Sequence, residues 1–172
     1  MPTTEAAVVD LIRASLEPAS RAAVRRMDSP ACRVVSEVLR GDMRDGGTDG
    51  IVFLAVGTAI AAAVLTETWA DAQDQGAAHF LDAFAATLPP GERTLSQLPP
   101  VLRSFLVPGE RAAHELLAEI WIADQENFFD VVVAFGDFAA NLITALAYKR
   151  IRTVDESFEQ LESTLRIFAG EG

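Results

Sequence analysis

Carboxylates and a histidine with the spacing of metal ligands lie in the middle of this sequence. Asp71 and Asp74, together with Glu67, fall within about 60° of one another on a helical wheel. His79 and Asp82 follow three positions apart, so that the carboxylate is able to orient the imidazole. Oxygen and imidazole ligands bind divalent cations, and the metal-ligand candidates are therefore Asp71, Asp74, His79 and Asp82. A solvated helix end and a surface ion pair explain the same residues.

A narrow polar stripe runs along the otherwise apolar residues 128–148. Its members lie within roughly 60° of one another on the helical wheel, and those that we assign as ligand-binding candidates are Asp130, Asp137, Asn141 and Tyr148. A surface helix has a much wider polar face, so neighbours are expected to surround this helix. The stripe then either lines a ligand pocket between helices or forms the narrow outer edge of a central helix.

The most apolar element expected to position these residues is a helix over residues 51–65. This run, IVFLAVGTAIAAAVL, contains no side chain more polar than that of Thr58. A membrane-spanning helix needs about 20 apolar residues, and a shorter run is typical of a buried core helix. Asp49 and Glu67 close the run, and no Lys or Arg lies near either end to orient a span. Burial in a soluble core is the favoured interpretation, and contact with a membrane is the alternative.

Length, charge and cysteine content restrict the class of protein. A chain of 172 residues is long enough for one domain with a substantial core. The single cysteine, Cys32, excludes an internal disulfide, and the first ten residues lack the pattern of a secretion signal. A cytoplasmic location is therefore expected. A formal net charge of −11 argues against nonspecific binding of nucleic acid, because phosphates attract Lys and Arg.

The charge is unevenly distributed along the chain. Residues 1–44 carry seven Arg against six Asp and Glu, a balance of +1, whereas residues 45–172 carry seven basic against nineteen acidic residues, a balance of −12. The stretch 41–50, GDMRDGGTDG, is the expected linker between these parts. We interpret residues 1–44 as an Arg-rich helical unit docked on an acidic bundle formed by residues 45–172. A basic surface for a partner is the alternative.

The predicted fold is an all-α, single-domain bundle of about six to eight helices, because nearly every segment has helical periodicity. Thr153 and Glu156 predict a capping box at the start of the last helix. Residues 51–69 and 128–148 are expected to be two central, nearly all-apolar helices. Their apolar circumference exceeds what a small bundle covers, so part of it is expected to form the interface of a homodimer.

Three classes of function fit this sequence. A noncatalytic interaction or regulatory protein, such as an accessory subunit or an acidic inhibitor of a partner, is the leading hypothesis, because no catalytic constellation stands out. The first alternative is a binder of a small apolar or amphipathic molecule between the central helices. The second is a metal-assisted helical enzyme that uses the four metal-ligand candidates. No nucleotide-binding loop or zinc-ligand spacing assigns a cofactor.

Overall fold

The computed structural model describes residues 4–23 and 25–170, and within these ranges every regular element is a helix. A short 3-10 helix, η1 (Arg26–Asp28), precedes α3. The α-helices are α1 (Thr4–Leu16), α2 (Pro18–Ala22), α3 (Pro30–Asp45), α4 (Asp49–Ala72), α5 (Ala77–Thr87), α6 (Arg93–Ser96), α7 (Leu98–Leu106), α8 (Ala113–Ala123), α9 (Gln125–Tyr148) and α10 (Val154–Phe168). The expected all-α bundle is confirmed.

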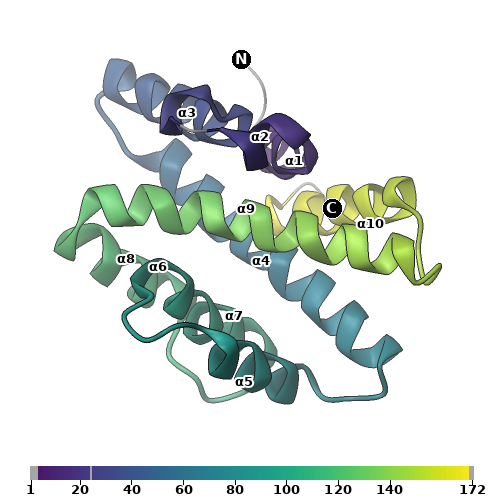
Figure 1. Cartoon of the computed structure of the whole chain (residues 1–172). Helices are drawn as coiled ribbons and strands as arrows, with labels where there is room; N and C mark the ends of the chain where they lie inside the picture. The colour runs from purple at the N-terminus through teal and green to yellow at the C-terminus, as the bar shows by residue number, and fades with distance from the viewer. Residues whose placement is uncertain (1–3, 24, 171–172) are drawn as a thin grey trace.

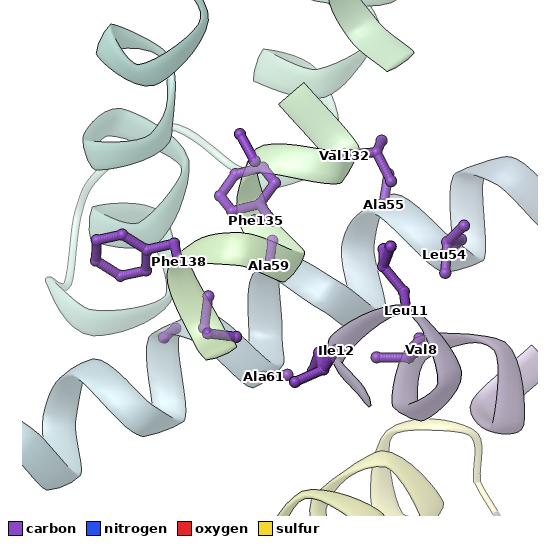
Figure 2. Packing of buried hydrophobic residues seen from close by; sticks show 14 of the residues in the cluster. Val8, Leu11, Ile12, Leu54, Ala55, Ala59, Ala61, Val132, Phe135 and Phe138 are labelled. Carbon is purple, nitrogen blue, oxygen red and sulfur yellow. The ribbon is translucent and has the colours of Figure 1, made fainter. Parts of the chain in front are cut away.

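The bundle is organised around the crossing of α4 and α9, which have 24 residues each. In Figure 1, α9 passes in front of α4, with α1 to α3 on one side of the pair and α5 to α8 on the other. Val132 of α9 lies beside Ala55 of α4, and Phe135 lies over Ala59 (Figure 2). Large side chains opposite small ones allow the two backbones to approach and the interior to fill at high density.

Helix α1 packs onto this crossing through side chains that are fully buried, namely Val8, Leu11 and Ile12. It contacts α4, α9 and α10, so the first helix of the chain lies against the last. Two glycines make room for it. A Cβ atom on Gly57 of α4 would lie 2.8 Å from Cγ2 of Val8, and one on Gly136 of α9 would lie 2.9 Å from Cγ of Leu11.

Helices α5, α7 and α8 cover the opposite side of the crossing with a second set of buried leucines: Leu81, Leu98, Leu102 and Leu117. Aromatic pairs join this layer to α9. The rings of Phe84 and Phe138 meet edge to face with centroids 5.1 Å apart, and Trp121 meets Phe128 with the same geometry at 5.1 Å. Both long helices therefore have apolar neighbours on opposite sides of the crossing.

Most of the predicted linker at 41–50 is wrong, because α3 continues to Asp45, where Gly46 caps it, and α4 begins at Asp49. Gly46 has a φ of +71°, a left-handed conformation that commonly ends helices and that glycine adopts without strain. The Asp42 carboxylate accepts hydrogen bonds from the backbone N–H groups of Gly50 and Ile51 at 2.9 and 2.8 Å. This side chain satisfies donors in the first turn of α4 and holds the connection between α3 and α4.

The Arg-rich part and the acidic part of the chain share one continuous hydrophobic cluster. Residues of α1 and α3, including Leu11 and Val35, belong to the same cluster as Leu54 of α4 and Phe135 of α9. The expected division after residue 44 falls in the last turn of α3.

The predicted capping box of α10 is confirmed. Thr153 Oγ1 accepts from the backbone N–H of Glu156 at 3.1 Å, and Glu156 Oε2 accepts from the backbone N–H of Thr153 at 2.7 Å. These two bonds satisfy donors that the first helical turn leaves free.

Two helices of this fold, α4 and α9, are long and apolar enough to cross a membrane by length and composition alone. In each, 61% of the apolar window is buried inside the fold. A core helix of a soluble bundle meets the same criteria, so this property does not distinguish the two environments.

The close approach at Gly57 generates a stability prediction. We expect Gly57→Ala to lower the free energy of unfolding by about 1–3 kcal/mol, because the added methyl group overlaps Val8 in a filled core. Gly41→Ala in α3 is the matched control. It meets nothing within 4 Å and is expected to raise the free energy of unfolding by up to about 1 kcal/mol through helix propensity. Urea denaturation measures both, and equal effects would contradict the close packing of α1 on α4.

Candidate functional site

Three of the four stripe residues face the Arg-rich N-terminal segment. Arg26 Nη2 lies 2.5 Å from Asp130 Oδ1, and Arg21 Nη2 donates to Asn141 Oδ1 at 3.0 Å. Tyr148, the fourth member, is 83% exposed at the end of α9. The stripe is therefore brought together with arginines along its first half and opens to solvent at its last residue.

Arg26 of η1 makes several contacts with α9, and we call this contact region between η1 and α9 the seam. Its Nη1 atom lies 3.2 Å from Glu126 Oε1, and its guanidinium carbon lies 4.1 Å from the centroid of the Phe129 ring. Its Nη2 atom also donates to the backbone carbonyl of Glu126 at 3.2 Å. A planar guanidinium suits this combination of carboxylate pairing and ring stacking.

The carboxyl groups of the stripe are held in different surroundings. Burial raises the pKa of Asp137, whereas the Ser15 hydroxyl and the Arg21 guanidinium oppose this effect. The Asp137 residue keeps an exposed edge, which limits the shift. Burial also raises the pKa of Asp130, and the pairing with Arg26 lowers it by less. Both carboxylates are thus partly desolvated.

Cys32, a nucleophilic residue, lies close to this seam in the first turn of α3. It is 7% exposed. Burial raises the pKa of its thiol, and the hydrogen bond with Ser29 and the charge of Arg26 lower it less. A buried thiol with a raised pKa is a poor nucleophile, because the thiolate is the reactive form. The contacts of Arg21 and Arg26 attach the N-terminal segment to α9 beside this thiol.

The metal-ligand candidates are spread along α4, the turn after it and α5. Asp71, Asp74 and His79 are exposed, and Asp82 Oδ1 lies 2.5 Å from Arg103 Nη1. Within residues 4–23 and 25–170, no three His, Cys, Asp or Glu side chains form a group that could hold a metal ion. The structure therefore does not bring the four candidates together.

Two open grooves lie away from the stripe. One, of about 710 Å³, lies beside α5, α6 and α7, and its lining includes Pro89, Pro99, Arg93 and Arg103. Both of these arginines are already ion-paired, Arg93 with Asp124 at 2.9 Å. The other groove, of about 370 Å³, lies between α1 and α10. No stripe residue lines either groove, so the structure does not form the expected pocket between the central helices at these grooves.

The outward face of α4 is an apolar surface that its neighbours cover only in part. We define this face by four residues spaced four apart: Val52, Val56, Ile60 and Val64. Val52 is 51% exposed and the other three are partly exposed, whereas most other residues of this stretch of α4 are buried. An interface on a central helix was predictable from the sequence, but its position was not, because residues 51–65 are apolar on every side.

Two aromatic side chains, one on α4 and one on α10, border the outward face of α4. Phe53, next to Val52, lies against Phe168 of α10 with ring centroids 5.4 Å apart. Phe168 is itself 42% exposed. The exposed apolar surface therefore continues from α4 onto the end of α10.

No family model, no curated protein and no solved structure matches this chain.

The surroundings of Asp137 generate a prediction of pH dependence. The pKa of Asp137 is raised in the folded state, which means that folding favours the protonated carboxyl group. The contribution of this group to the free energy of unfolding is therefore complete below the ordinary Asp pKa of about 3.9 and is lost as pH rises through the folded pKa. We therefore expect Asp137→Asn to stabilise the protein at neutral pH, and this gain to vanish toward about pH 3. Thermal melts across this range measure the difference.

Asp124→Asn is the control of opposite sign. A backbone hydrogen bond from Asn127 lowers the pKa of Asp124, and pairing with Arg93 adds to this effect. The contribution of ionised Asp124 to the free energy of unfolding is therefore present above the ordinary Asp pKa and is lost as pH falls through the folded pKa. The variant should therefore be less stable than the native chain at neutral pH and equal to it in acid. Parallel pH profiles for the two variants would contradict these assignments.

Proposed function

We propose that this chain is a noncatalytic interaction protein, an accessory or regulatory subunit that binds a partner protein through the outward face of α4. The observation that carries this proposal is an apolar line on α4 in which Val52 is 51% exposed and Val56, Ile60 and Val64 are partly exposed, whereas most other residues between 51 and 65 are buried. Single exposed apolar residues are ordinary on protein surfaces, but a continuous apolar strip is typical of a binding surface.

The energetics of burial favour a protein partner on this surface. Each apolar Å² removed from water contributes roughly 25 cal/mol, so covering the strip with another apolar surface stabilises a complex. The residues are β-branched and lie on a helix anchored by the core, so little side-chain entropy is lost when a partner orders them. A rigid apolar strip resembles the apolar core of protein interfaces.

The alternative functions have weaker support. A ligand binder between the central helices needs space beside the stripe, where Arg21 and Arg26 pair with Asn141 and Asp130. A metal-assisted enzyme needs ligands that converge, and the four candidates do not form a group. We therefore propose an interaction protein in preference to either.

Charge substitutions on the outward face of α4 test this proposal. We expect Val52→Glu and Val56→Glu each to reduce capture of the native partner from the source lysate by about tenfold or more, because a buried carboxylate without a counter-charge is costly. Ile122→Glu in α8 is the control, since Ile122 is 82% exposed and lies outside this face. Circular dichroism melts check that each variant is folded.

Light scattering distinguishes the occupants of this face. A native mass of one chain, with partner capture lost only in the α4 variants, supports the proposal. Partner capture that survives both substitutions on α4 would contradict it. A native dimer that Val52→Glu converts to a monomer would assign the same face to the homodimer expected from the sequence.

A further inference from the structure

The apolar line along α4 ends in a carboxylate on each side. Asp49 precedes Val52 by three positions, Glu67 follows Val64 by three, and Asp71 follows Glu67 by four. Residues spaced three or four apart lie on the same side of a helix. All three carboxylate residues are exposed. Along its outward side, α4 therefore presents one acidic residue, then the four apolar residues of the outward face, and then two acidic residues.

These three carboxylates have no cation of their own in the described part of the chain. The ion pairs that join described residues involve other acids, on α5, α8, α9 and α10, the loop before α8 and the turn before α9. Arg93, Arg103 and Arg111, the three cations between residues 45 and 148, are each occupied by such pairs. None of the ion pairs within residues 4–23 and 25–170 therefore neutralises the acids at the ends of the apolar strip.

We propose that the partner presents an amphipathic helix whose apolar stripe has Lys or Arg at both ends, and that this helix packs along the outward face of α4. This inference rests on the proposed function. The distance from Val52 to Val64 corresponds to about 18 Å along a helix axis, which a partner helix of about four to five turns spans with its flanking cations. Side chains in an i, i+4 row form the ridges that a second helix packs against.

Charge complementarity selects this partner over a second copy and over an anionic membrane. In an antiparallel pair of α4 helices, Asp49 of one chain faces Glu67 and Asp71 of the other, and like charges disfavour such a contact. Anionic lipid headgroups meet the same carboxylates and are repelled. Cations at both ends of a partner helix instead neutralise the two acidic ends while its apolar stripe covers the valines and Ile60.

Two synthetic peptides test this inference with the full chain. Each has about 18 residues and the same leucines at helical spacing, and one carries Lys at both ends whereas the other carries Glu. We expect the Lys-ended peptide to bind about tenfold more tightly at low salt, measured by fluorescence anisotropy. The preference should shrink as salt is added, because the end charges are exposed.

Charge reversal on the protein provides the matched variant. We expect Glu67→Lys with Asp71→Lys to reduce or invert the preference between the two peptides. The same two changes should leave the melting temperature nearly unchanged, since both side chains are exposed. Asp155→Lys in α10 adds the same kind of charge away from this face and should leave the preference as it is.

The outcomes separate this inference from the proposed function. Equal binding of both peptides, lost in Val56→Glu, would overturn the charge inference and leave the outward face of α4 as a binding surface. Binding of neither peptide, or binding that Val56→Glu does not affect, would count against both. Binding to phosphatidylserine vesicles that depends on Val56, or a dimer that depends on it, would overturn the inference in favour of a membrane or a second copy.

Discussion

The close crossing of α4 and α9 is the constraint on which the rest of this structure depends. Ala55 and Ala59 of α4 lie near Val132 and Phe135 of α9 in Figure 2, and these two longest helices contact each other more extensively than any other pair does. Once they are fixed in this way, their remaining sides define the positions that other helices occupy. Helices α1, α3 and α10 fill one set of these positions, and α5, α7 and α8 fill another.

The polar contacts of α9 lie on the side that it turns toward α2 and η1, away from the buried crossing with α4. The stripe on α9 is too narrow to face open water along its whole length, and α2 and η1 contribute Arg21 and Arg26 to it. Neither of these short helices has a buried residue of its own. Their attachment therefore depends on charge and hydrogen bonding, in contrast to α1, which is held by buried side chains such as Leu11.

Local chemistry was predictable from the sequence wherever neighbouring residues decide the outcome. Thr153 and Glu156 interact only with each other's backbone and side chain, so their capping box is visible in four residues. The same is true of the helical class, since periodicity is a local property. The end of α3 was not predictable in this way, because Gly41 and Gly46 are both possible stop signals, whereas the helix continues through Gly41 and its Asp42 side chain bonds to the start of α4.

The candidate sites were harder to predict, because the role of each residue depends on which residues it contacts in the folded protein. A single sequence does not show these contacts. Asp130 has the same appearance whether it lines a cavity or pairs with Arg26, and that pairing joins residues about a hundred positions apart. The outward face of α4 was not predictable either, because exposed and buried residues of this helix have similar side chains. Val56 and Leu54 are equally apolar, yet one is partly exposed and the other is fully buried, because neighbouring helices cover only some sides of α4.

The placement of α1 has a consequence for how the chain folds during synthesis. Val8 and Leu11 are synthesised more than a hundred positions before α9 and α10, which supply part of their cover. At about 5–20 residues per second, roughly ten to thirty seconds pass before that cover exists. The packing around α1 is therefore completed only after α9 and α10 have been synthesised.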